Sequence, residues 1–242
     1  MIDSETAVKQ VRAALEIDNA INLHRYPVKV SVNANALVLE GEVESVAAKK
    51  LALVHAGAAV DGDGDVVDRL RVMPAQRCGD GAIRDGFAAM LAGQREYSNC
   101  GIRTRSGSVT KVVRAAPEER SGDIEIGVED GVIHLKGSVI SLSHKRVAGV
   151  LAWWTPGCRD VANDLGLDPP ERDNDEEVVE ALSLVFEMDQ ELDGGQIGIG
   201  AHDGVVTLEG FVSSDTQRRR AELDAWALFG VSKVVNHIDV RA

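Results

Sequence analysis

The sequence has few cysteines, few aromatic residues and no long apolar run. Its 242 residues include three cysteines, six prolines and 4% aromatic residues. Cys78, Cys100 and Cys158 are odd in number and widely spaced, which argues against a disulfide framework and against a C-x-x-C zinc site. We therefore expect three unpaired thiols. A transmembrane helix needs about 18 consecutive apolar residues, and without such a run no membrane span is expected.

Basic residues are scarce too. The chain has 26 lysines and arginines against 39 aspartates and glutamates, a formal net charge of -13. Non-specific nucleic-acid binding needs an excess of cations facing phosphate, so nucleic acid is not an expected partner.

Residues 1–14 lack a basic stretch followed by an apolar one, so no signal peptide is expected. The expected location is the cytoplasm, or the periplasm if a leader has been removed.

A hairpin pattern occurs three times along the chain. Alternating apolar residues, the mark of a half-buried strand, begin at Val28, Ile124 and Ile197. Each run leads to a turn signal and then to a second alternating strand whose third member is glycine. The turn residues are expected at Asn35-Ala36, Asp130-Gly131 and Asp203-Gly204, and the strand glycines are Gly41, Gly137 and Gly210.

A helix and a third strand follow each hairpin. Four residues after each glycine stands a serine that we expect to cap the helix N-terminus. Small residues recur on one face of the helix, so we expect this face to pack closely over the strand glycine. The final alternating strand follows a long crossover and can lie parallel to an earlier strand. The capping serines are Ser45, Ser141 and Ser214.

An amphipathic helix also precedes each hairpin. Ser4 can cap the first helix and Asn174 or Asp175 the third, while the second contains Gly86 in its interior. We therefore predict an α+β protein of three tandem αββαβ modules, each a three-stranded mixed sheet with two helices on one face. The expected modules are residues 1–74, 75–170 and 171–242.

The second module contains an insertion. The first strands of modules one and two are 96 residues apart, whereas those of modules two and three are 73 apart. The extra residues fall near 92–122 and form either a hairpin extension or a flexible loop. Their segment 101–116 has four cations and no acid, which makes it the candidate site for an anion or a phospholipid head group. These cations are Arg103, Arg105, Lys111 and Arg114.

The charge differs strongly among the modules. Residues 1–74 have 8 basic and 11 acidic side chains, residues 75–172 have 13 of each, and residues 173–242 have 5 basic and 15 acidic ones. An anionic membrane would repel the last module but not the middle one. We therefore expect any lipid contact to involve the middle module.

Other candidate sites have weaker support. Asp61, Asp63 and Asp65 alternate as in a calcium loop, but valines stand where such a loop needs its glycine and bidentate glutamate. The six histidines show no paired spacing, and the glycine-rich run at 194–200 is itself a strand. We expect no metal, no cofactor and no catalytic residues, so the protein is predicted not to be an enzyme.

Three tryptophans lie late in the second helices of the last two modules. Trp153 and Trp226 occupy the same position after the strand glycine, and Trp154 follows directly. We expect these residues to pack between modules, with lipid contact as the alternative.

The repeated pattern resembles the BON domain family. The resemblance is most specific in residues 204–212, GVVTLEGFV, and in residues 229–236, FGVSKVVN. It implies αββαβ modules without a catalytic centre, and a link to phospholipid, membrane surfaces, transport and osmotic stress in bacteria. The alternative is a cytoplasmic protein-interaction or self-association scaffold with no lipid role, which includes a homo-oligomer.

Overall fold

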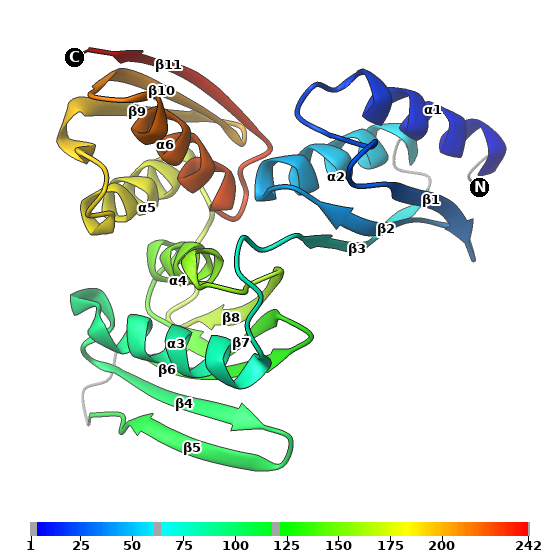
Figure 1. Cartoon of the computed structure of the whole chain (residues 1–242). Helices are drawn as coiled ribbons and strands as arrows, with labels where there is room; N and C mark the ends of the chain where they lie inside the picture. Colours follow the sequence, from blue (N-terminus) through cyan, green and yellow to red (C-terminus); the bar gives the residue numbers. More distant parts are fainter. Residues whose placement is uncertain (1–3, 61–63, 118–121, 242) are drawn as a thin grey trace. The chain divides into compact units, whose positions relative to one another are not determined.

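A computed structural model describes residues 4–60, 64–117 and 122–241, in two compact units. The first unit, Met1–Met73, contains one module, and the second, Pro74–Ala242, contains two (Figure 1). In every module a helix, an antiparallel strand pair, a second helix and a parallel strand follow one another. The α+β class and the repeated modules are therefore confirmed. Asp61 and Asp63 of the aspartate run lie outside the described residues.

The first module has a three-stranded sheet in the order β1-β2-β3. Strand β1 is antiparallel and β3 parallel to the central β2, as the long helical crossover allows. The helices α1 and α2 both pack on this sheet. The elements are α1 (Ser4–Ile17), β1 (Val28–Asn33), β2 (Ala36–Val43), α2 (Val46–Val60) and β3 (Asp65–Val72).

The second module differs from the prediction in its sheet, which has five strands in the order β5-β4-β6-β7-β8. The insertion forms the hairpin β4–β5, and β4 pairs parallel with β6. The expected three-stranded sheet is wrong here, because repeat spacing locates extra residues but not the sheet edge that accepts their hydrogen bonds. The elements are α3 (Asp80–Gly93), η1 (Arg95–Tyr97), β4 (Cys100–Ser106), β5 (Val109–Arg114), β6 (Gly122–Glu129), β7 (Val132–Val139), α4 (Leu142–Trp154) and β8 (Asp160–Leu167).

The third module repeats the topology of the first, with strand order β11-β10-β9. Its first helix is capped by Asn174, whose side chain accepts a hydrogen bond from the Glu177 amide at 3.0 Å. The elements are α5 (Asp175–Met188), η2 (Gly194–Gln196), β9 (Ile197–His202), β10 (Val205–Val212), α6 (Asp215–Ala227) and β11 (Lys233–Val240).

Each hairpin turn has two residues with positive φ, the geometry of a type I′ turn. Asp-Gly fills both positions in the last two modules. In the first module the pair is Ala34 (46°) and Asn35 (68°), so the expected turn at Asn35-Ala36 is wrong by one residue. Asn35 takes the position that glycine holds elsewhere, because asparagine tolerates the left-handed conformation better than most residues.

The repeated strand glycine has a backbone reason. Gly41, Gly137 and Gly210 have φ values of 143°, 119° and 122°. A Cβ atom at any of these glycines would come closer than 3.0 Å to a backbone carbonyl oxygen. That oxygen lies either in the neighbouring strand or in the residue that precedes the neighbouring strand. The sequence suggested that the helix approaches these glycines most closely. The nearest atoms belong instead to the backbone of the neighbouring strand or of the residue before that strand. These oxygens belong to Pro27, Asp123 and Gln196.

The serines after these glycines lie at helix N-termini. Ser45, Ser141 and Ser214 each accept a hydrogen bond through Oγ from the amide three residues later, at 3.1–3.3 Å. Such a bond satisfies one of the free amides at a helix start. The helices then bury their small-residue faces, which include Ala52, Ala56, Ala148, Ala152, Ala221 and Ala225.

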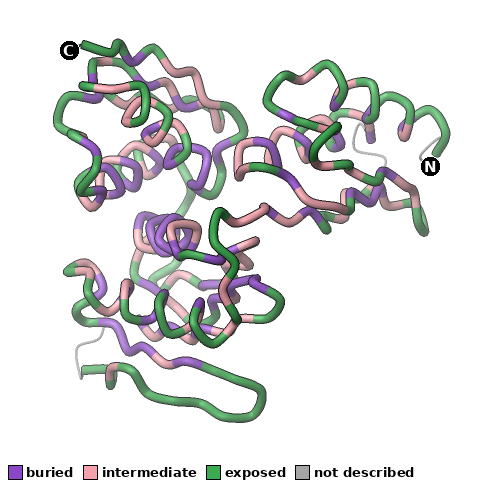
Figure 2. The backbone as a smooth tube through the Cα atoms, in the orientation of Figure 1, coloured by how far each residue is buried: buried purple, intermediate pink, exposed green. Residues whose placement is uncertain are grey.

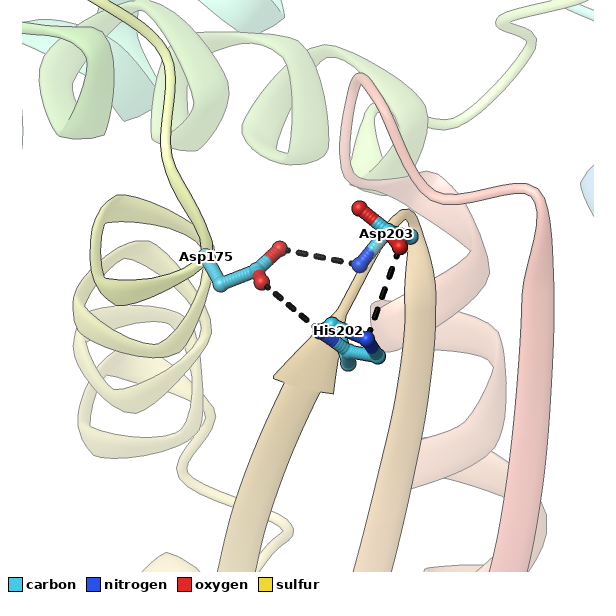
Figure 3. A group of neighbouring side chains, drawn as sticks. All are labelled: Asp175, His202 and Asp203. Carbon is cyan, nitrogen blue, oxygen red and sulfur yellow. Dashed lines mark hydrogen bonds and ion pairs between the residues drawn. The ribbon is translucent and has the colours of Figure 1, made fainter.

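In the last two modules an aspartate at the start of the first helix binds the hairpin turn. The Asp80 carboxylate accepts hydrogen bonds from the amides of Asp130 and Gly131, at 3.0 and 2.9 Å. Asp175 accepts one from the Asp203 amide at 3.1 Å, and its other oxygen lies 3.3 Å from His202 Nδ1 (Figure 3). We call these contacts the aspartate clasps, since they tie the helix to the hairpin.

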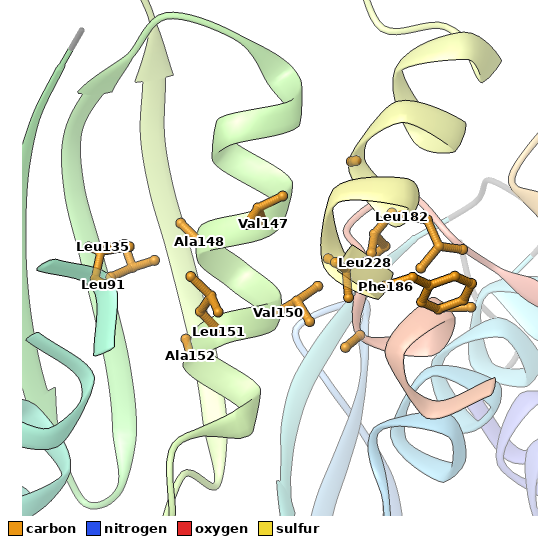
Figure 4. Packing of buried hydrophobic residues seen from close by; sticks show 14 of the residues in the cluster. Leu91, Leu135, Val147, Ala148, Val150, Leu151, Ala152, Leu182, Phe186 and Leu228 are labelled. Carbon is orange, nitrogen blue, oxygen red and sulfur yellow. The ribbon is translucent and has the colours of Figure 1, made fainter. Parts of the chain in front are cut away.

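The second and third modules share one hydrophobic core. Helix α4 packs against α5 and α6 of the next module, and Val150 points from α4 toward Leu182 and Phe186 of α5 (Figure 4). The buried segments in Figure 2 include these facing helices. The short join at residues 166–174 therefore does not separate these two modules.

Buried polar groups also connect these two modules. The Arg146 side chain on α4 is fully buried, and it donates to the Phe229 carbonyl oxygen at 3.1 Å and to the Asp173 carboxylate at 2.6 Å. Trp154 Nε1 donates to Asp224 Oδ1 at 2.7 Å. Trp226 is also buried. At Trp154, the expected inter-module contact includes a polar bond as well as apolar packing.

Candidate anion-binding face

The open face of the five-stranded sheet carries alternating charges. Helices α3 and α4 pack on one side of the sheet, so every second residue of its strands points to the other side. Strand register places Arg103, Glu125, Lys136 and Asp164 side by side across β4, β6, β7 and β8. We call these four residues the charged row. Opposite charges as direct neighbours stabilise a sheet.

Arginines of β4 pair with acids of β6 on this face. Arg103 contacts Asp123 at 2.6 Å and Glu125 at 3.0 Å, and Arg105 contacts Glu125 at 3.4 Å. Hydrogen bonds from Arg103 and Arg105 lower the pKa of Glu125, although burial opposes this shift. The Asp123 and Glu125 contacts likewise raise the pKa of Arg103. Both arginines are therefore held in place by acids that were outside the predicted site.

Beside these pairs the face has a hollow of about 500 Å³. Gly127 lies between Arg105 and His134 in the register, and its missing side chain leaves space there. The hollow is lined by Arg105, Gly107, Glu125, Gly127, Val128, Glu129, His134 and Lys136. Arg105 and Lys136 would present positive charge to a ligand and His134 a ring nitrogen, whereas Glu125 and Glu129 would oppose an anion.

The structure separates the four predicted anion-binding residues. Arg103 and Arg105 lie together on the open face. Lys111 is exposed on β5 opposite Thr104, whose side chain is buried on the helix side. Arg114 turns inward and donates to the carbonyl oxygens of Cys100 and Ala92, at 2.9 and 3.1 Å, and also to that of Tyr97. Arg114 thus anchors the hairpin to the end of α3.

His134 and Lys136 line the hollow but were outside the sequence-based site. Strand alternation could have found them, because both are out of phase with the buried Ile133 and Leu135 of β7. Their proximity to Arg105 could not have been found, since it depends on the parallel pairing of β4 with β6. The basic charge of segment 101–116 therefore identified Arg103 and Arg105 on this face but not His134 and Lys136.

One further group of ligand-type atoms lies at the start of α5. Asp175, His202 and Asp203 each place one such atom within 4.8 Å of the others (Figure 3). Their mutual contacts include His202 Nε2 to Asp203 Oδ2 at 3.4 Å, and both His202 and Asp203 are highly exposed. The Asp80 clasp likewise binds turn amides through a carboxylate at a helix start, without a histidine. The group is therefore explained by its structural role in the clasp.

We expect Asp80→Ala to destabilise the second unit by about 1–2 kcal/mol, because two amides of the hairpin turn lose a charged acceptor. The measurement is urea unfolding followed by tryptophan fluorescence, since all three tryptophans lie in this unit. Asp85→Ala is the control, because this exposed aspartate contacts only Arg84 in the described chain and should change stability by less than about 0.5 kcal/mol. Equal effects of both changes would contradict a role of the clasp.

No helix in the described parts of the chain is both long enough and apolar enough to cross a membrane.

Comparison with protein families finds that the family model described as "BON domain" matches residues 3–74, 104–169 and 174–242. Two solved structures of CdsD, a structural protein of the type III secretion system of Chlamydia trachomatis, are also similar to this chain. The C-terminal domain structure has 13% identity, a TM-score of 0.24 and coverage of 100% of both chains. The other has 14% identity, a TM-score of 0.24 and coverage of 97% of this chain and 91% of that chain. A comparison with curated proteins finds no match.

Proposed function

Because the chain belongs to the BON domain family, in three tandem copies, we propose that it is a non-catalytic binding protein that contacts anionic phospholipid head groups. BON domains are generally binding domains without catalytic activity. The proposed contact is the open face of the second module, at the hollow beside Gly127. A role in stress or transport at a membrane surface would follow from this contact.

The observation that carries the proposal is the grouping of Arg105, His134 and Lys136 around the hollow. Arg105 is 55% exposed and its contact with Glu125 is the longest of the three pairs on this face. A phosphate group can therefore compete for Arg105 at low cost and gain Lys136 as a second partner. The strongly acidic third module is less suited to this contact.

We expect the double variant Arg105→Gln and Lys136→Gln to bind anionic vesicles roughly 10- to 30-fold more weakly, since each cation contributes about 1 kcal/mol near a charged membrane. Co-sedimentation with anionic and zwitterionic vesicles measures this. Arg103 stays unchanged because its removal would leave Asp123 and Glu125 without their closest cation.

The control is Arg218→Gln with Arg219→Gln, which removes the same charge from α6 of the third module. This control should bind as the unchanged protein does. Lack of binding by the unchanged protein, or an equal loss in both double variants, would reject the proposed face.

A protein-interaction role is the second candidate, and a different observation favours it. The acids of the charged row largely neutralise the open face, while β5 at the sheet edge is exposed along most of its length. An exposed strand edge is suited to pairing with another strand.

A further inference from the structure

We propose that β5 pairs with β5 of a second copy of this chain, joining two five-stranded sheets across a two-fold axis. The proposal does not depend on lipid binding. Strand β5 is the last strand in the order β5-β4-β6-β7-β8, and its pairing in the described chain is with β4 alone. The hydrogen-bonding groups on its other side are therefore open to a partner strand.

The side chains of β5 are unusual for an edge. Val109, Val112 and Val113 are 67%, 64% and 41% exposed, and no other element of the described chain contributes three exposed large apolar residues. β-Branched residues favour strand pairing, and exposed edges normally avoid them.

Other edge strands in the described chain are better protected. In one of them, β1, Lys29 is the charged residue and the three valines are buried or half-buried. Charged residues at several positions, or glycines, occupy the other four. These residues include Asp68 and Arg69 in β3, Asp160 and Asp164 in β8, Gly198 and Gly200 in β9, and Lys233 and Asp239 in β11. In β5 the Arg114 guanidinium is bound to backbone carbonyls of the same module, so Lys111 is left as the charged side chain of this edge.

Two antiparallel registers pair five residues of β5 with the same residues of a second copy, centred on Lys111 or on Val112, and the sequence favours one of them. Centring an antiparallel pair on Lys111 would place two lysines directly opposite each other, which is unfavourable. Centring the pair on Val112 places Val112 opposite its copy, Lys111 opposite Val113, and Thr110 opposite Arg114. No like charges then face each other, and the lysine stem covers a valine. This self-complementarity argues for a second copy as the partner.

The expected association is reversible. β5 has six residues, and its pairing with β4 shifts register near Val113, which shortens the regular part of the edge. We expect a Kd on the order of micromolar or weaker, as for small interfaces. Sedimentation velocity of the full chain, over a range of concentrations around this value, should show a monomer–dimer equilibrium.

Two variants at one exposed position test the register. Val112→Lys and Val112→Glu each place like charges opposite each other at the axis, so both should raise the dimer Kd at least about tenfold. An acidic partner strand would instead be lost with Val112→Glu and kept with Val112→Lys. Val54→Lys is the matched control, because Val54 is an exposed valine on α2, outside any sheet edge.

The proposal is supported if the unchanged protein and Val54→Lys dimerise while both Val112 variants do not. Tryptophan fluorescence of both Val112 variants should match that of the unchanged protein, since Val112 is exposed. A strict monomer at all concentrations, a dimer that persists in both Val112 variants, or a loss confined to Val112→Glu would overturn it.

Discussion

Replacing Gly137 with alanine is expected to lower the free energy of unfolding of the second unit by about 3–5 kcal/mol. The φ angle of 119° at Gly137 is unfavourable for any residue with a Cβ, at a cost of about 1–3 kcal/mol. The added methyl group would also overlap the Asp123 carbonyl oxygen on β6. Since both atoms belong to paired strands of a packed sheet, relief requires displacement of the β6–β7 pairing.

Gly127→Ala provides the matched control in the same sheet. Gly127 lies on β6, and a Cβ there would meet only the His134 side chain at 3.9 Å, which is an ordinary contact. Alanine at this position should change stability by less than about 1 kcal/mol. Urea unfolding followed by tryptophan fluorescence compares the two variants in the second unit. Similar unfolding midpoints for both would show that the geometry at Gly137 does not constrain the residue.

The second large effect is expected at Asp224, where α6 of the third module meets α4 of the second. Burial raises the pKa of Asp224 from 3.8 to about 7, and the nearby Asp189 carboxylate adds to this rise. The Trp154 indole hydrogen bond and the Arg220 charge oppose it. Within the described residues Asp224 Oδ2 accepts no hydrogen bond, while Arg220 is bound to Asp189 and also to Glu191 at 2.8 Å.

The sign of the pH dependence follows from the raised pKa. Between pH 3.8 and about 7 the folded protein binds a proton at Asp224 that the unfolded chain releases. The resulting stabilisation is fully present below the unfolded pKa and is lost as the pH rises through the folded one. Each pH unit in this window contributes up to about 1.4 kcal/mol.

Asp224→Asn should remove this dependence, because asparagine resembles the protonated carboxyl and keeps an oxygen for Trp154. We expect the stability advantage of the variant over the unchanged protein to be about 2–3 kcal/mol larger at pH 8 than at pH 5, because about two pH units of this window lie between the two conditions. Urea unfolding at both pH values measures the difference. Asp215→Asn is the control, since this exposed aspartate pairs with Arg218 on the surface. A difference between Asp224→Asn and the unchanged protein that is the same at both pH values would contradict the raised pKa.

Local features of the modules could be predicted because their causes are close in sequence. The turns at Asp130-Gly131 and Asp203-Gly204 require residues that accept positive φ, and the serines before the second helices offer an acceptor to nearby amides. The error at the first turn has the same basis. Asn35 has an alanine on each side, and the sequence alone could not show whether Ala34 or Ala36 forms the turn with it.

The candidate site was predicted only in part, because it depends on strand order. Composition located Arg103 and Arg105 in an insertion that was expected to be either a hairpin extension or a flexible loop. Their pairing with Asp123 and Glu125, and the approach of His134 and Lys136, follow from β4 lying parallel to β6. A count of charges along the chain could not distinguish Arg103 on the open face from Arg114, which binds backbone carbonyls.

The sequence by itself determined three αββαβ modules, their turns and caps, and the position of the insertion, because periodicity and turn chemistry act over a few residues. Tertiary structure alone decided that the insertion extends the second sheet, that its arginines meet acids of the next strand, and that the last two modules share a core. These outcomes depend on hydrogen bonding and burial between residues far apart in the chain, where many pairings satisfy the same local pattern.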